Sequence, residues 1–196
     1  MRTLSVLWRR LDVPGHDACR IALSGSGCEL DGTAVFEHSG AAARLAYVLV
    51  CDESWRTVRG SVHGFVGPEP IDVLVERRSD GGWTVDGEPV PGLESIEHLD
   101  YGFTPATNFP QLRQLARGDG RGGNVPVTWL DVPPARLVVL EQRYERRSAT
   151  TWWYEAPRFG YSALLELTPD GLVRRYPGLW ERERSPQYGR TRSTPR

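Results

Sequence analysis

Side chains that could bind a polar group gather in DYGFTPATNFPQLRQL, residues 100–115. Asp100 supplies a carboxylate, Asn108 an amide and Arg113 a guanidinium, and together these groups could hold a charged or hydroxylated partner. His98 stands two residues before Asp100, so both side chains project from the same side of an extended chain. A carboxylate that orients an imidazole is a general-base arrangement, whereas a histidine at the rim of a turn is structural. The segment therefore predicts a polar site and leaves both binding and proton transfer open.

The order of residues in this segment predicts a strand that leads into a helix. Thr107 or Asn108 can cap the first amides of a helix, and Gly118 is placed to end it. Apolar residues recur between them at helical spacing: Phe109, Leu112, Leu115 and Ala116. We therefore expect a helix that begins near Asn108, with Asp100 accepting hydrogen bonds from nearby amides or from Arg113.

The segment resembles the central motif of the bacterial Putative glycolipid-binding family, formerly a domain of unknown function, which reads approximately TPxTNxLPIRRL. The matching residues of this chain are Thr104, Pro105, Thr107, Asn108, Arg113 and Leu115. The chain departs from the motif at three places: the proline comes one position early at Pro110, Phe109 replaces a smaller residue, and Gln114 stands where a second arginine is usual. The likeness continues through Trp129, EQRYERR at 141–147 and GLVRRYPGLW at 171–180.

The resemblance implies a mainly β fold, in which a strongly curved antiparallel sheet or half-barrel wraps around one or two α-helices, as in lipoprotein-localisation-factor-like proteins. It also implies a groove between helix and sheet that would bind a glycolipid or another amphiphile.

Strand signals dominate the chain independently of that resemblance. Five segments are rich in Val, Leu, Tyr and Trp and are separated by Gly, Pro and Asp: residues 4–11, 45–51, 71–77, 136–146 and 161–168. Asp-Gly pairs, which favour hairpin turns, stand between such runs at residues 31–32, 80–81, 86–87 and 170–171. Neighbouring strands should therefore be mostly antiparallel, and GDGRGGNV at 118–125 is expected to form a loop.

One predicted strand, residues 136–146, has a graded face. Its first half is apolar on both sides, which predicts burial of both faces, and alternation then resumes. Gln142 and Tyr144 share a face with Val138 and Leu140, so this face passes from aliphatic to polar, as an amphiphile would require. The expected ligand-binding residues are Asp100, Thr107, Asn108, Arg113, Gln142, Tyr144, Tyr176 and Trp180.

The aromatic residues divide between core and binding roles. Core packing is favoured for three of the seven tryptophans: Trp8, Trp55 and Trp83. Trp152-Trp153-Tyr154 should place neighbouring rings on opposite faces of a strand. Tyr176 and Trp180 flank the Pro177-Gly178 turn, which makes them the better candidates for a ligand surface, although core packing remains open for both.

Composition restricts the class of protein. With 196 residues, 39% of them hydrophobic and 25% charged, the chain resembles one soluble globular domain. Cys19, Cys28 and Cys51 lack CxxC spacing and are expected to be buried thiols, and a net charge of -1 gives no basic surface for nucleic acid. No apolar run could span a membrane, and Arg9 and Arg10 interrupt the first apolar stretch, so we expect a cytoplasmic location.

These patterns lead to one functional hypothesis and two alternatives. We expect a single domain over residues 1–180 and an arginine-rich flexible tail over 181–196. Neither zinc-ligand spacing nor a nucleophile elbow is present, so no catalytic, metal or cofactor site is predicted. The first hypothesis is non-enzymatic binding of a glycolipid or a similar amphiphile. The alternatives are an enzyme that uses Asp100, His98 or Tyr144 as acid or base, and an interaction domain without a small ligand. The sequence carries no signal for an oligomeric state.

Overall fold

The computed structural model describes residues 2–183, which form strands, one α-helix and one short 3-10 helix. The strands are β1 (Arg2–Arg10), β2 (Gly15–Ser24), β3 (Gly27–His38), β4 (Ala41–Cys51), β5 (Thr57–Val66), β6 (Glu69–Arg77), β7 (Trp83–Val85), β8 (Glu88–Val90), β9 (His98–Tyr101), β10 (Gly122–Asn124), β11 (Val127–Asp131), β12 (Arg136–Leu140), β13 (Arg143–Arg146), β14 (Thr151–Ala156), β15 (Tyr161–Leu167), β16 (Val173–Tyr176) and β17 (Trp180–Arg182). The helices are α1 (Asn108–Arg117) and η1 (Pro157–Phe159). No helix among these residues is long and apolar enough to cross a membrane.

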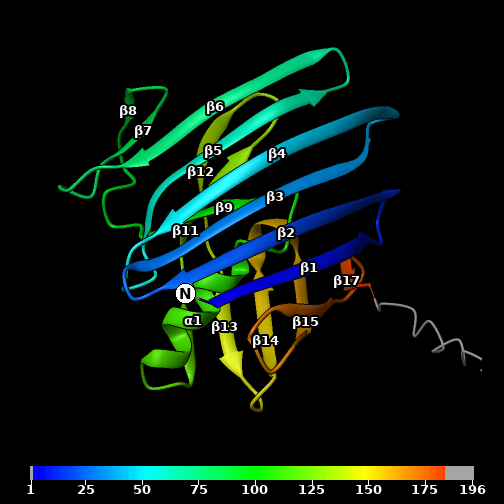
Figure 1. The fold of residues 1–196 in the computed structure, drawn as a ribbon. Coiled ribbons are helices and arrows are strands. Elements are labelled where there is room, and N and C mark those ends of the chain that lie inside the picture. The colour runs from blue at the N-terminus through cyan, green and yellow to red at the C-terminus, as the bar shows by residue number, and fades with distance from the viewer. Residues whose placement is uncertain (1, 184–196) are drawn as a thin grey trace, which may run out of the picture.

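Fourteen strands form one large, curved antiparallel sheet that does not close (Figure 1). Its order is β10-β13-β14-β15-β16-β17-β1-β2-β3-β4-β5-β6-β7-β8. The pairing of β17 with β1 joins the two halves of the chain, with Trp180 opposite Arg10. Long alternating strands explain the shape, because twist accumulates along them and curves the sheet around its apolar face. The predicted fold, a curved antiparallel sheet around a helix, is confirmed.

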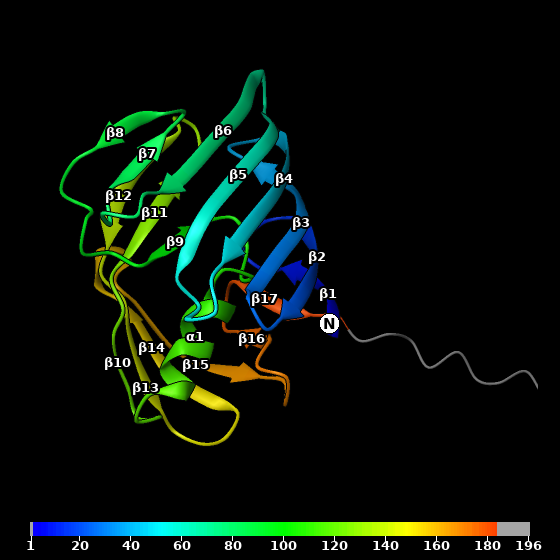
Figure 2. The ribbon, with the colours of Figure 1, turned by 60° about the vertical axis from the view of Figure 1, so that its left-hand side comes forward.

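A second sheet of three strands, in the order β12-β11-β9, packs against the first (Figure 2). Its β9 runs parallel to β11, with Asp100 opposite Trp129. Gly60 of β5 is needed where the sheets meet, because a Cβ atom there would lie 2.6 Å from Leu99 Cδ2 and would also clash with the Tyr101 hydroxyl. All four residues of β9 are buried, so this edge strand of the small sheet is covered where it meets β5 of the large sheet.

Helix α1 begins at Asn108 and ends at Arg117, as predicted. At its end the Gly118 amide donates a hydrogen bond to the backbone carbonyl of Gln114. In both ribbon views the helix lies between the N-terminal strands and the strands β13 and β14 (Figures 1 and 2). Its first turn is fully packed: the buried residues are Asn108, Phe109, Pro110, Gln111 and Leu112. The helix therefore joins the two halves of the sheet at its N-terminal end.

Several sequence predictions were wrong in detail. The segment 136–146 is divided at Glu141, because β12 belongs to the small sheet and β13 to the large one. Val139 is 38% exposed, so the first half is not buried on both faces. GDGRGGNV contains the short strand β10, which pairs with β13.

One of the four Asp-Gly pairs is not a turn. Asp31-Gly32 lies in the middle of β3, where Gly32 leaves room for the Tyr47 ring from β4. The other three pairs do connect strands, and Asp86 and Gly87 both have positive φ, as a tight hairpin turn requires.

The C-terminal boundary lies beyond the predicted one. Strand β17 continues to Arg182, and the Glu183 amide binds Leu7 O. The predicted flexible tail, apart from residues 181–183, lies outside the described residues.

The aromatic and cysteine predictions agree with the structure. The tryptophans Trp8, Trp55 and Trp83 are buried, and all three cysteines are buried free thiols. Trp152 and Tyr154 are buried while the intervening Trp153 is partly exposed, so β14 alternates as expected.

Candidate functional site

A cavity of about 400 Å³ lies between the junction of β9 with α1 and the strands β14–β17. Its lining combines aromatic, aliphatic and polar side chains with one glycine. The lining residues are Asp100, Tyr101, Gly102, Thr104, Asn108, Trp129, Leu140, Tyr154, Ala156, Phe159, Tyr161, Tyr176, Leu179 and Trp180. Asp100 is the only one of them with a side chain that is charged at neutral pH.

The cavity is graded from a buried polar end to an exposed apolar end. Asp100 and Asn108, at the strand-to-helix junction, are almost completely buried. Phe159, in η1, is 52% exposed and packs edge-on against Trp129, with 5.4 Å between the ring centroids. Leu179 is partly exposed as well. A ligand would therefore meet apolar groups at the mouth and hydrogen-bonding groups at the base.

The Asp100 carboxylate is held by two neutral donors. Thr107 Oγ1 donates to Oδ1, and Gln142 Nε2 donates to Oδ2 at 2.7 Å. Burial raises the pKa of Asp100 to about 6, while these two hydrogen bonds act in the opposite direction. No basic side chain is hydrogen-bonded to Asp100 among the described residues, so its charge is not neutralised locally.

The hydrogen bonds around Tyr144 orient the Asn108 amide. A carboxylate only accepts, so Gln142 must present its nitrogen to Asp100 and its carbonyl to Tyr144, at 3.3 Å. The single hydrogen of the Tyr144 hydroxyl goes to Gln142 Oε1 or to Gln111 Oε1, which lies at 2.8 Å, and in either arrangement the hydroxyl accepts from Asn108 Nδ2 at 2.8 Å. Burial raises the pKa of Tyr144, which keeps the hydroxyl protonated. The Asn108 nitrogen is thus engaged, and its carbonyl oxygen is left for the cavity.

A second buried carboxylate lies beside the cavity. Asp17, on β2, accepts hydrogen bonds from the Tyr47 hydroxyl at 3.0 Å and from Thr104 Oγ1. Thr104 also lines the cavity and accepts a hydrogen bond from the Ala106 amide at 3.0 Å. Burial raises the pKa of Asp17 to about 6. Within residues 2–183, two carboxylates without a cationic partner therefore flank the polar end.

The helix-capping prediction was wrong. Thr107 occupies the N-cap position, but its side chain makes no capping hydrogen bond to the helix amides. The Thr107 hydroxyl instead donates to Asp100 and accepts from the Tyr101 amide at 3.3 Å, and Asn108 binds Tyr144. Asp100 accepts from two side chains rather than from Arg113. The polar residues of the junction hold one another in place rather than the helix end.

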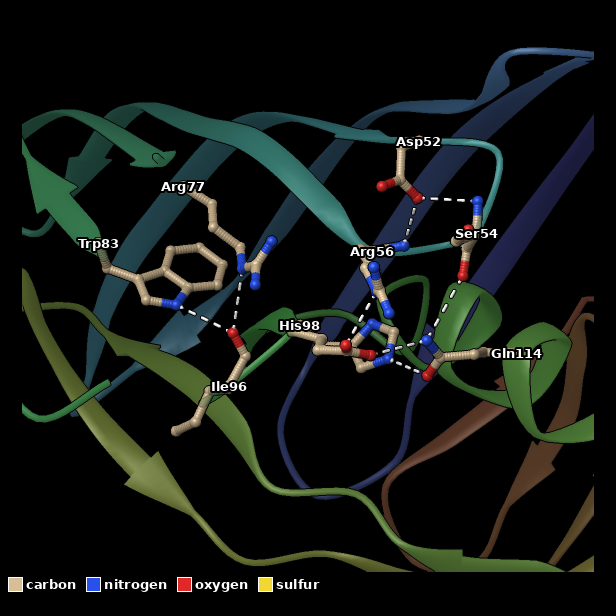
Figure 3. Close-up of polar contacts among 9 residues, drawn as sticks. Asp52, Ser54, Arg56, Arg77, Trp83, Ile96, His98 and Gln114 are labelled. Atoms are coloured by element: carbon tan, nitrogen blue, oxygen red, sulfur yellow. Dashed lines mark hydrogen bonds and ion pairs between the residues drawn. The ribbon is translucent and has the colours of Figure 1, made fainter. Parts of the chain in front are cut away.

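His98 and Asp100 are not hydrogen-bonded to each other. His98 Nε2 lies 2.8 Å from Gln114 Oε1, and Gln114 Nε2 donates to Glu97 Oε2 at 2.9 Å (Figure 3). His98 Nε2 must therefore carry the proton that is donated to Gln114. Burial lowers the pKa of His98, and its Nδ1 has no partner among the described residues. This neutral histidine does not line the cavity. Its hydrogen bond to Gln114 helps to hold α1 against β9.

The same group of side chains fixes α1 to the loop between β4 and β5. Gln114 Nε2 also lies 3.4 Å from Ser54 O, and Arg117 donates to Glu53 O at 2.7 Å. Figure 3 shows Arg56 directed toward the same region, where it pairs with Glu97 at 2.8 Å. Gln114 thus receives a structural role at the position where the family motif usually has an arginine.

The predicted ligand residues fall into three groups. Those that line the cavity are Asp100, Asn108, Tyr176 and Trp180. Those that lie behind it and hold its polar end are Thr107, Gln142 and Tyr144. Arg113 is in neither group, because its guanidinium lies over the Trp55 ring at 5.3 Å and over the Phe109 ring at 5.7 Å.

Sequence reasoning missed several residues around the cavity. Asp17 had a usable signal, since it occupies an inward position of an alternating strand in which Cys19 and Ile21 are also buried. Trp129 lies within the family likeness but was not assigned to the site, and Phe159 had no signal, because the two rings are brought together from a strand and a separate turn. Tyr154 and Tyr161 could be placed on strands but not on one shared surface.

This chain belongs to the Putative glycolipid-binding family, whose sequence model matches residues 5–182. Its fold is similar to the crystal structure of a DUF1089-family protein from Pseudomonas aeruginosa, with 25% identity, a TM-score of 0.72, and coverage of 93% of this chain and 95% of that chain. It is also similar to a beta-barrel-like protein of the domain of unknown function DUF1849 from Brucella abortus, with 12% identity, a TM-score of 0.50 and 92% coverage of each chain, a likeness of fold alone. No curated protein matches the chain.

Proposed function

We propose that this member of the family binds an amphiphile in the cavity, with the polar head group at Asp100 and Asn108 and the apolar part at the mouth. The observation that carries the proposal is the gradient of the cavity itself. Its buried end offers hydrogen-bonding atoms, and its exposed end offers Phe159 and Leu179. An amphiphile bound in this direction keeps its head group hydrogen-bonded and removes apolar surface from water.

The size of the cavity supports head-first binding. A volume of about 400 Å³ is at the lower end of the range of about 300–1,000 Å³ for small-molecule sites. Such a space holds a head group and the first part of a chain rather than a complete lipid with two acyl chains. The remainder of the chain would extend over the exposed apolar residues at the mouth.

The predicted ligand residues take different parts in this proposal. Tyr176 and Trp180 form part of the aromatic wall of the cavity, and Asp100 and Asn108 contact the head group. Thr107, Gln142 and Tyr144 position those two polar side chains without touching the ligand. Arg113 stabilises α1 through its contacts with Trp55 and Phe109.

Occlusion of the cavity tests the proposal. Ala156 lines it from β14, so Ala156→Phe should fill the space without removing a polar group. The variant should fold and lose binding of a fluorescent alkyl amphiphile. Ala18→Phe, on an exposed position of β2, is the matched control and should keep the affinity of the unmodified protein. Equal affinity of both variants would contradict binding in this cavity.

Extraction of the purified protein provides an independent measurement. Organic extracts analysed by mass spectrometry should contain an amphiphile from the wild-type protein and none from Ala156→Phe. An amphiphile recovered in the same amount from both would place binding elsewhere on the protein.

A further inference from the structure

We propose that the head group bound at the base of the cavity carries a positively charged nitrogen, which is recognised by Asp100 and by the surrounding aromatic rings. This inference rests on the proposed function, because it names the chemical class of head group for the same cavity. It follows from three properties of the lining: its charge, the direction of its hydrogen-bonding groups, and its aromatic content.

The charge of the lining favours a cation. Asp100 is the only lining residue with a charged side chain at neutral pH, and both of its oxygens are bound by neutral donors. Asp17 adds a second carboxylate behind Thr104. Since burial raises the pKa of each to about 6, both are mostly ionised near pH 7.5. A phosphate or carboxylate head group would enter a negative site, whereas an ammonium would neutralise it.

Two arginines lie over aromatic rings of the lining, and they do not reverse this charge. The Arg10 guanidinium lies 5.4 Å from the centre of the Trp180 ring, but it forms a bidentate ion pair with Asp12, with hydrogen bonds of 2.8 and 2.9 Å. Arg158 lies over the Trp129 ring at 5.9 Å, at the exposed mouth. Neither residue lines the cavity.

The two polar side chains at the base, Asp100 and Asn108, present oxygen acceptors to the cavity. The chain of bonds from Asp100 through Gln142 and Tyr144 engages the Asn108 nitrogen and leaves its carbonyl oxygen toward the cavity. Asp100 itself only accepts when ionised. These two acceptors favour a head group that donates hydrogen bonds, or that carries a diffuse positive charge, at this end.

The walls are made of rings that attract cations. Aromatic side chains from six elements line the space beside Asp100: Trp129, Tyr154, Phe159, Tyr161, Tyr176 and Trp180. Three of the tyrosines pack on one another, with centroid distances of 5.4 Å for Tyr154 and Tyr176 and 5.5 Å for Tyr161 and Tyr176. Aromatic enclosures of this kind bind quaternary ammonium groups through the negative faces of their rings. A neutral sugar could also stack here, but it would leave the carboxylate charge unpaired.

The test compares three amphiphiles that share a dodecyl chain and differ only in the head group: dodecyltrimethylammonium, dodecyl glucoside and dodecyl phosphate. Each is titrated by calorimetry below its critical micelle concentration, near pH 7.5. We expect the ammonium compound to bind at least about tenfold more tightly than the glucoside, and the phosphate to bind most weakly. This comparison uses the unmodified protein and does not depend on the folding of any variant.

Asp100→Asn gives the residue-specific measurement. It should weaken binding of the ammonium compound by about tenfold or more and leave glucoside binding within about twofold. Asp72→Asn, at a carboxylate whose side chain is 89% exposed, is the control and should change neither affinity.

The outcomes separate the two proposals. Glucoside or phosphate binding as tight as that of the ammonium compound would overturn the cationic head group and leave amphiphile binding in place. Equal losses for all three head groups in Asp100→Asn would also overturn it. If none of the three compounds binds, the proposed function itself fails.

Discussion

Gln142 and Asp100 are 42 positions apart in the chain and are joined by a hydrogen bond of 2.7 Å. Gln142 lies at the break between β12 and β13, where the chain leaves the small sheet and enters the large one. The backbone carbonyl oxygen of Gln142 accepts a hydrogen bond from the Val125 amide at 2.8 Å. This side chain therefore connects the crossing point of the two sheets to the base of the cavity, and the stability of the fold and the shape of the site depend on the same bonds.

Tyr144→Phe should destabilise the protein by about 1–3 kcal/mol. The substitution removes a buried hydroxyl and leaves the Asn108 nitrogen and Gln111 Oε1 without their partner. Urea denaturation followed by circular dichroism measures the change. Arg143→Gln, on the opposite face of β13, is the control and should cost less than about 1 kcal/mol, because its ion pairs are exposed. Equal losses for the two variants would mean that the buried network contributes nothing specific.

The stability of the protein should fall as the pH rises from about 4 to about 7. The pKa of Asp17 and that of Asp100 are each raised from 3.8 to about 6 in the folded protein. A folded-state pKa above the unfolded value gives stability that is complete below about pH 4 and is lost as the pH passes about 6. The loss at neutral pH is at most about 3 kcal/mol for each carboxyl group.

Comparison with Asp100→Asn isolates this effect from other groups. The pKa of Asp12 is lowered by its hydrogen bonds and charge pairing with Arg10 although burial opposes this, so this carboxyl acts in the opposite direction. The difference in Tm between wild type and Asp100→Asn, measured from pH 4 to pH 7.5, subtracts such contributions. Asp100→Asn should gain stability relative to wild type as the pH rises. Parallel curves for the two proteins would show that Asp100 does not titrate in this range.

The secondary-structure elements could be predicted better than the site. An element depends on residues that are close in the sequence, whereas the site depends on residues that are far apart in it. Helix α1 and strands such as β4 and β6 follow from periodicity and turn residues within about ten positions. Gln142 and Tyr144 are both buried, as the alternation indicated, but they do not continue one strand face with Val138 and Leu140, which belong to the other sheet. The break at Glu141 could not be predicted, since it depends on which sheet each half of the segment joins.

The functions of polar side chains at the junction were harder to predict. A threonine before a helix favours capping, but Thr107 binds Asp100 because both are buried beside Gln142, which comes from a distant strand. Likewise, Arg113 was expected near a head group and instead lies over Trp55, which is supplied by the β4–β5 loop. Such long-range partners leave no local pattern in the sequence.

Gly32→Ala should destabilise the protein by about 1–3 kcal/mol. The added Cβ atom would lie 2.8 Å from Tyr47 Cε1, and still closer to other atoms of that ring, in the middle of β3. Displacement of Tyr47 would also disturb its hydrogen bond to Asp17. Gly25→Ala is the matched control, because a Cβ atom there meets no other residue within 4 Å. A wild-type Tm for Gly32→Ala would show that the Tyr47 position is not fixed by this contact.

Affinity for an alkyl amphiphile should depend on chain length only over the part of the chain that meets the mouth of the cavity. With the head group at Asp100, successive methylenes pass Phe159 and Leu179 before they reach solvent. Each methylene fully removed from water contributes about 0.8 kcal/mol, or about fourfold in affinity, and later ones contribute less. Calorimetry with alkyltrimethylammonium compounds of increasing length should therefore give a rise followed by a plateau.

Phe159→Ser identifies where that rise originates. The substitution removes the most exposed apolar side chain of the lining and should reduce the gain per methylene while leaving the shortest compounds almost unaffected. Leu164→Ser, at an exposed leucine of β15 that does not line the cavity, is the control and should keep the wild-type length dependence. If the chain were buried at the base and the head group exposed, Phe159→Ser would weaken all chain lengths equally or none of them, and head-first binding would be excluded.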